Sequence, residues 1–299
     1  MRVNPNFNSD MINYIEQAQQ AVDNASEQLS TGRRVNLPSD DPAADAAMVQ
    51  ENSQSASIDQ YTANSDSLTD VLNTGDSTLS SVVTLMQQAS SLAIEGSGSG
   101  MSQSDLSSIA AQVSDIQSQM LSLANTSFGG QYIFGGTAST TPPYVADAST
   151  PGQIDYVGNS QQNQVQIGTG VSVAANLPGS SIFSQSGANV FDALQSLTTA
   201  LQSGNTTNIA SAGTAITTAL NAVSTAQVFY GNTVDELSSN ESWLSQEKLN
   251  ITSYQNTLVA SNTAAAATDA TQAETVLSAS VAAAAQIDQQ ANLLNYLQP

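Results

Sequence analysis

Carboxylates are the side chains of this sequence whose types and spacing could do chemistry, because histidine and cysteine are both absent. The densest group of carboxylates is Asp40, Asp41 and Asp45. A calcium site needs more oxygen ligands and a glycine-turned loop such as that of an EF-hand, and this segment has neither. Asp41 precedes Pro42, and a carboxylate before a proline is typical of a helix start. We interpret the group as helix capping and predict no metal site.

Two other patterns could indicate catalysis. The glycine-rich stretch at 96–100 has no strand before it and lacks the Gly-Lys-Ser/Thr ending of a phosphate loop. Glu241 and Glu247 could form a pair of acids for glycoside hydrolysis, but both lie inside a long helical pattern, which favours a solvated helix face. We predict no catalytic residue and no cofactor. A secreted enzyme on a helical stalk stays open, and it requires a cleft of titratable groups within residues 129–188.

The charge balance excludes two classes of partner. The chain carries 4 Lys+Arg against 25 Asp+Glu, a formal net charge of -21. Such a surface repels nucleic acid and anionic lipid. There is also no apolar run of about 20 residues, the length that a membrane-spanning helix needs. We therefore predict neither a nucleic-acid nor a membrane partner.

The elements that position these residues are helices, and those at the two ends of the chain share one pattern. Apolar and small residues recur there with the 4-3 alternation of a coiled coil. They are Met11, Ile15, Ala18, Val22, Ala25 and Leu29 near the start, and Ala273, Leu277, Ser280, Ala284, Ile287, Ala291 and Leu294 near the end. A buried Leu, Ile or Val contributes roughly 1.5–3 kcal/mol and an Ala much less. We expect the two helices to pair, and we expect the pair to need further neighbours from other copies of the chain.

Local signals set the expected ends of these helices. Ser9 or Asp10 is the predicted cap of the first helix, and Gly32 is its predicted left-handed stop. The next helix carries a long apolar seam that contains Gly75, which indicates either a close backbone approach or a bend. Ser102 and Asp105 are spaced to cap a third helix. A later helix, up to about Thr263, should span on the order of 80 Å.

The composition changes between Gly129 and Gly179, which hold half of the 18 glycines and half of the 8 prolines. Residues 164–173 alternate polar and apolar side chains around a Gly-Thr-Gly break, a pattern that predicts a β-hairpin. Residues 131–134 and 153–157 are candidates for further strands. The predicted fold is mainly α: a long antiparallel helical, coiled-coil rod from both chain ends, with a small β-rich insert.

Three motifs carry a resemblance to a known family. They are QLSTGRRVNLPSDDPAA at 28–44, LANTSFGGQYIFGG at 123–136 with TTPPY at 140–144, and NAVSTAQVFYGNTVDEL at 221–237. The first resembles the segment that ends the first helix of flagellins and their relatives, and the chain's last helix resembles the matching C-terminal helix. Taken together, the three are similar to hook-associated members of the flagellin superfamily.

The resemblance implies a structural protein of the bacterial flagellum: a non-catalytic adaptor at the hook–filament junction, with filament-forming flagellin as the alternative. It implies three layers, formed by 1–40 with 265–299 (inner tube), 41–128 with 189–264 (long helices), and 129–188 (outer β domain). The implied partners are further copies in a ring, the first hook-associated protein, flagellin and an export chaperone. The implied location is extracellular, after export by the flagellar secretion apparatus without a cleaved signal peptide.

The candidate site is therefore a set of subunit contacts on the terminal helices and the first connector. Arg33 and Arg34 lie next to Asp40 and Asp41, so local salt bridges are one interpretation and contact with another subunit is the one we favour. The full set of candidate contact residues is Met11, Ile15, Val22, Leu29, Arg33, Arg34, Asp40, Asp41, Leu277, Ile287, Leu294 and Leu297.

Overall fold

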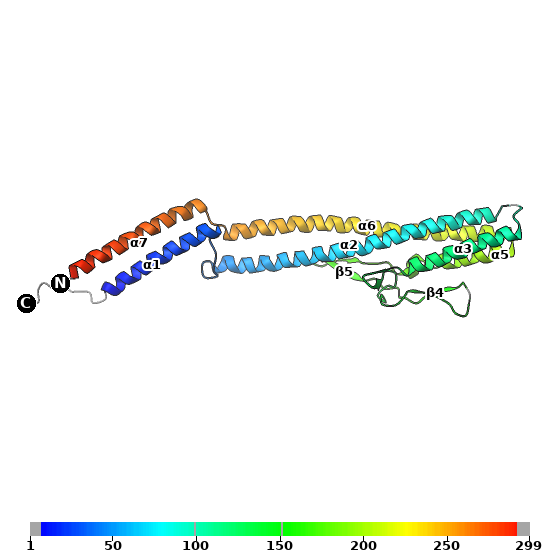
Figure 1. The fold of residues 1–299 in the computed structure, drawn as a ribbon, viewed down its shortest axis with the longest axis horizontal. Coiled ribbons are helices and arrows are strands. Elements are labelled where there is room, and N and C mark those ends of the chain that lie inside the picture. The colour runs from blue at the N-terminus through cyan, green and yellow to red at the C-terminus, as the bar shows by residue number, and fades with distance from the viewer. Residues whose placement is uncertain (1–6, 99, 151, 292–299) are drawn as a thin grey trace, which may run out of the picture. The chain divides into compact units, whose positions relative to one another are not determined.

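Helices form most of the protein, and short strands occupy a single stretch of the chain (Figure 1). The structure, a computed structural model, describes residues 7–98, 100–150 and 152–291. The helices are α1 (Phe7–Thr31), α2 (Pro42–Gly96), α3 (Gln103–Ala124), α4 (Gly179–Ile182), α5 (Val190–Ser203), α6 (Thr206–Val259) and α7 (Thr263–Ala291). The strands are β1 (Ser127–Phe128), β2 (Gln131–Tyr132), β3 (Tyr144–Ala146), β4 (Ile154–Tyr156), β5 (Gln164–Gly168), β6 (Val171–Ala174), β7 (Ser184–Gln185) and β8 (Ala188–Asn189). The mainly α fold with a small β insert is confirmed.

The chain divides into two compact units. Unit 1 holds the residues up to Ser57 and those from Gln246 onward, and unit 2 is Ile58–Ser245. The three-layer division implied by the family resemblance concerns an assembled tube and stays a prediction.

In unit 1, α1 and α7 lie side by side (Figure 1). Three small residues of the predicted seams are buried: Ala18 and Ala25 on α1 and Ala273 on α7 each expose 9% or less of their surface. The seam on α7 also extends further toward its N-terminus than predicted, through Ala266 and Ala270. Over these residues the seams keep the 4-3 spacing expected from the sequence, but the predicted seam residue Leu29 is 40% exposed.

The predicted cap of the first helix is wrong. Because α1 begins at Phe7, Ser9 and Asp10 lie inside the helix rather than before it. Downstream boundaries agree better with the sequence. Gly32 adopts a φ of 68°, and Ser102 forms a capping box with Asp105 at the start of α3.

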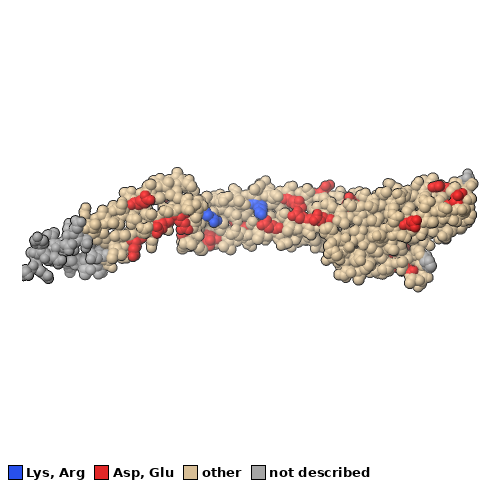
Figure 2. Space-filling view, viewed as in Figure 1, with Lys and Arg blue, Asp and Glu red and all other residues tan. Residues whose placement is uncertain are grey.

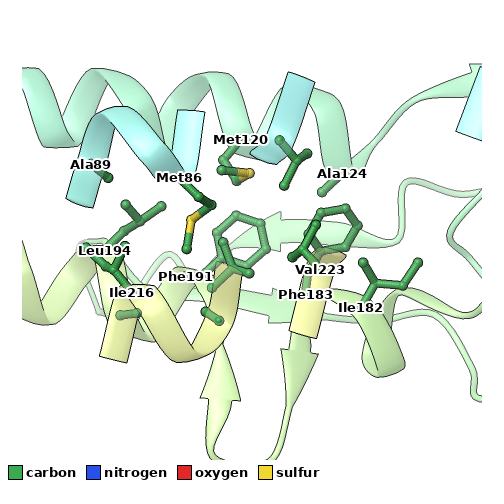
Figure 3. Close-up of a cluster of buried hydrophobic side chains, with 14 of the residues drawn as sticks. Met86, Ala89, Met120, Ala124, Ile182, Phe183, Phe191, Leu194, Ile216 and Val223 are labelled. Carbon is green, nitrogen blue, oxygen red and sulfur yellow. The ribbon is translucent and has the colours of Figure 1, made fainter. Parts of the chain in front are cut away.

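Unit 2 has a continuous apolar core formed by four long helices and the insert. Side chains from α2, α3, α5 and α6 point toward one another in this core, joined by Ile182 and Phe183 from the short helix α4 and its C-terminal end (Figure 3). The seam predicted for α2 is buried from Leu68 to Ala93. The apolar periodicity therefore identified the core face of the long helices correctly.

Gly75 marks a close approach and not a bend. It lies inside the continuous helix α2, and a Cβ built on it would be 2.4 Å from Cε1 of Tyr230 on α6. The Tyr230 ring is completely buried. The missing side chain of Gly75 makes room for this ring.

The insert consists of four separate two-stranded antiparallel sheets. The hairpin predicted at 164–173 is β5–β6, with Gln164 opposite Ala174. The insert joins the helical core through aromatic rings: Tyr144 of β3 lies 5.6 Å from Phe183 and 5.1 Å from Phe191, centroid to centroid. The insert and the helices of unit 2 consequently share one core.

Candidate assembly surface

The connector between α1 and α2 pairs with the short link between α6 and α7 in unit 1. Arg33 and Ala260 form an antiparallel bridge, the Arg34 N–H donates to the Val259 carbonyl at 2.6 Å, and the Ser261 N–H donates to the Gly32 carbonyl at 2.9 Å. Two stretches from opposite ends of the chain thus form a small ladder, which we call the joint (residues 32–41 and 258–262).

The Arg34 side chain reinforces the joint. Its Nη2 donates to Oδ2 of Asp41 at 3.0 Å and to the Leu258 carbonyl at 3.1 Å. Arg34 therefore makes the local salt bridge that was one of the two sequence interpretations. Arg33 has an exposed side chain, and whether either arginine contacts another subunit stays a prediction.

Asp40 and Asp41 both accept backbone hydrogen bonds within the joint. Asp40 accepts from the N–H groups of Leu37 and Asn36, which lower the pKa of its carboxyl below the usual value. The Ala44 N–H donates to Asp41 and is the larger cause of its lowered pKa, with Arg34 the second. Asp41 thus caps α2 directly before Pro42, as the sequence predicted.

The joint is expected to open as these carboxyls are protonated. Because their pKa values are lower in the folded chain than in the unfolded one, their contribution is complete above about pH 4 and is lost as the pH falls below that. Hydrogen exchange followed by mass spectrometry measures the protection of the backbone amides of residues 32–44. After correction for the effect of pH on the intrinsic exchange rate, this protection should be the same at pH 7 and pH 5 and lower near pH 3. Asp41→Asn should expose the same segment already at pH 7. Glu16→Gln, which changes an exposed carboxylate of α1, should not.

The other predicted contact residues lie in different environments. Met11, Ile15, Val22 and Leu277 are half-buried, at the seam positions where α1 and α7 pair within one chain, and Leu29 is 40% exposed. Ile287 belongs to α7, and Leu294 and Leu297 fall outside the described residues. Part of the predicted contact set therefore serves contacts within the chain, and its role between subunits stays a prediction.

Sequence reasoning missed the apolar side chains that the terminal helices expose. They are Ile12 and Tyr14 on α1, 58% and 65% exposed, and Val276 and Val281 on α7, both 49% exposed. Each lies next to or near a seam position, so the signal was an apolar residue off the seam of a coiled coil. Large apolar side chains outside the paired seam are available to further helices.

The two acids considered for catalysis, Glu241 and Glu247, both lie within the long helix α6. In unit 2, burial and then the nearby Asp66 raise the pKa of Glu241. In unit 1, Glu247 accepts long hydrogen bonds from Gln54 and Asn250, at 3.5 and 3.4 Å. Among the described residues, no group of three or more acidic side chains is placed to hold a metal ion, and no helix is long and apolar enough to cross a membrane.

Comparison with known proteins agrees with the fold and the motifs. Residues 4–139 match the bacterial flagellin N-terminal helical region. The chain is 32% identical over 191 residues to flagellar hook-associated protein 3 of Escherichia coli K12, a match that covers 59% of this chain and 59% of that protein. It thus spans about three fifths of the length of this curated relative.

Solved structures show the same architecture. A flagellar hook-associated protein from Vibrio parahaemolyticus superposes with a TM-score of 0.68 at 21% identity, covering 74% of this chain and 99% of that one. A flagellar junction protein from Legionella pneumophila gives a TM-score of 0.60 at 16% identity, covering 72% and 100%. The chain therefore has the fold of these flagellar hook-associated and junction proteins, and its N-terminal part matches the helical region of bacterial flagellin.

Proposed function

We propose that this protein is a structural, non-catalytic subunit of the bacterial flagellum that joins the hook to the filament and assembles through its terminal helices. The observation that carries the proposal is the sequence match to flagellar hook-associated protein 3 of Escherichia coli K12, 32% identical over 191 residues. The motifs at 123–136 and 221–237 support it, and each contributes buried residues to the core of unit 2, among them Phe134 and Tyr230.

The physics of unit 1 supports assembly through the ends of the chain. The α1–α7 pair is held mainly by alanines, which contribute little burial energy, while Ile12, Tyr14 and Val276 remain exposed. Helices of this length with little packing are marginal in water. Packing against α1 and α7 of neighbouring copies would bury these side chains and complete the structure.

The proposed partners follow from the proposed position. Copies of the chain form a ring, the first hook-associated protein lies on the hook side and flagellin lies on the filament side. An export chaperone holds the C-terminal region before secretion, and the assembled protein is extracellular.

Deletion of the gene tests the junction role. We expect cells without filaments that release flagellin into the medium, with both defects repaired by the full chain supplied from a plasmid. Filaments of normal length in the deletion strain would contradict the proposal. The alternative, a flagellin that itself builds filament, predicts shortened or absent filaments without released flagellin.

Paired substitutions test the assembly surface. The Ile12→Asp, Val276→Asp double variant should fail to restore filaments, because it places charges where neighbouring helices would pack. The matched control is Val157→Asp, which changes an equally exposed valine of the insert (53%) and should restore filaments. Circular dichroism of both purified monomers should match the parent and so exclude misfolding as the cause.

A further inference from the structure

A neutral pocket lies between α2 and the insert in unit 2. Its volume is about 580 Å³, within the 300–1,000 Å³ that is usual for small-molecule sites. Leu68 and Ile133 are the buried apolar residues of its wall, and two aromatic side chains of the β1–β2 hairpin, Phe128 and Tyr132, line it as well. The pocket thus has both apolar surface and aromatic rings.

The free polar groups of the pocket are uncharged. Gln131 and Gln164 contribute amide side chains and Tyr132 a hydroxyl, and none of these three side-chain groups is hydrogen-bonded within the described part of the chain. Each amide offers both donors and an acceptor. Groups of this kind match a ligand whose own groups both donate and accept, as sugar hydroxyls do.

The charge around the pocket excludes other ligand classes. None of the described lining residues carries a charge, and Ile58–Ser245 contains no lysine or arginine. Few acidic side chains appear over the widened, strand-bearing part of unit 2 on the face shown in Figure 2. Phosphates and carboxylates would find no counter-charge in a chain of net charge -21, and a cation would find no carboxylate in the lining.

The frame of the pocket is held by hydrogen bonds that leave the lining amides free. Asn64 on α2 donates to the Gln166 carbonyl of β5 at 2.8 Å, and the Tyr132 N–H donates to the Ser139 carbonyl at 2.8 Å. The buried Asn176 donates to the Gly136 carbonyl at 3.2 Å and accepts from the Asn163 N–H at 2.9 Å. The backbone frame of the pocket is thus held without the amides of Gln131 and Gln164, which stay available to a ligand.

We propose that this pocket binds a neutral saccharide, with Phe128 or Tyr132 against a sugar face and the amides of Gln131 and Gln164 on its hydroxyls. Apolar C–H faces of a sugar ring suit the flat apolar faces of aromatic side chains. This binding activity is separate from the junction role and does not depend on it.

Titration of the full-length chain with neutral disaccharides tests the proposal. Cellobiose, maltose and N,N′-diacetylchitobiose would be followed by saturation-transfer NMR and calorimetry, with glucose 6-phosphate as the charged comparison. We expect saturable binding of at least one disaccharide and none of the phosphate. Gln131→Ala and Gln164→Ala should each weaken binding about fivefold to tenfold, the effect of losing one or two hydrogen bonds. Gln162→Ala, which removes an exposed amide outside the pocket, should leave the affinity unchanged.

Three results would overturn the proposal. They are the absence of binding by all three disaccharides, equal binding by the parent and the Gln131→Ala, Gln164→Ala double variant, and equal binding of glucose 6-phosphate. Protection of Gln131 and Tyr132 on self-association of the chain, without saccharide binding, would assign the pocket to a second copy instead.

Discussion

Tyr144→Ala is expected to lower the free energy of unfolding of unit 2 by about 3–5 kcal/mol, the range for removing a large buried aromatic side chain. The Tyr144 ring is 1% exposed and contacts the rings of Phe183 and Phe191. The backbone of Tyr144 is also held by Asn125 at the end of α3, through hydrogen bonds of 2.8 and 2.9 Å. The variant therefore opens a cavity where the insert meets the helices. Urea denaturation followed by circular dichroism measures the loss.

Two variants show that the loss comes from the ring. Tyr144→Phe keeps the ring and removes only the hydroxyl that lies 3.2 Å from Oγ of Ser184, so it should cost about 1 kcal/mol. Tyr254→Ala removes a tyrosine side chain that is 49% exposed and should change stability by less than about 0.5 kcal/mol. If Tyr144→Ala cost no more than Tyr144→Phe, the insert and the helices would not share a core.

The sequence predicted the helical faces well because their signal is local. A seam residue is recognised from neighbours three and four positions away, so the seam of α2 could be read without knowing what packs against it. The β5–β6 hairpin was recognisable for the same reason, since its Gly-Thr-Gly turn and its alternating strands are contiguous.

Side-chain caps predicted the starts of α2 and α3 correctly but not the start of α1. Asn262 is a capping residue that the sequence patterns did not reveal: its Oδ1 accepts from the N–H groups of Ala264 and Ala265 at 3.1 and 3.3 Å. Asn262 therefore caps α7, which begins at Thr263, ten residues before the first seam residue recognised in the sequence, Ala273. A capping asparagine in an Asn-Thr-Ala context resembles many other asparagines of this chain, so it stood out only in the structure.

The burial of Tyr144 could not be predicted, because it depends on residues distant in sequence, whereas Ile12 and Val276 carried a local signal whose meaning depends on the partner helix. Tyr144 is buried by rings at 183 and 191. The position of Ile12 off the seam matters only once α7 is known to cover the other face of α1. The assembly surface thus consists of the apolar side chains that stay exposed after α1 and α7 have paired within the chain. Sequence periodicity identifies the residues that form this pairing, not the residues that it leaves exposed.

Gly75 combines a local and a distant determinant, and it leads to the second prediction. Its seam position could be read from the sequence, but the choice between a bend and a close approach depends on Tyr230 of α6. In an open helical site, Gly→Ala stabilises by about 0.5–1 kcal/mol. At Gly75 the new Cβ would lie 2.4 Å from a ring that is fully buried and cannot rotate away. We expect Gly75→Ala to lower the free energy of unfolding by about 1–3 kcal/mol, the usual cost of overpacking.

Gly231 is the matched control, because it lies in α6 next to Tyr230, and apart from its two chain neighbours and the nearby backbone of its own helix no atom comes within 4 Å of a Cβ built on it. Gly231→Ala should therefore stabilise unit 2, so the same substitution has opposite signs at two helical glycines beside the same tyrosine. The Gly75→Ala, Tyr230→Leu double variant should lose less unfolding free energy than the two single variants lose together. The difference should be at least about 1 kcal/mol, since the smaller leucine side chain relieves the clash. Additive single variants, or a stabilising Gly75→Ala, would mean that the α2–α6 spacing is set elsewhere along the seam and that Gly75 is tolerated there, not required.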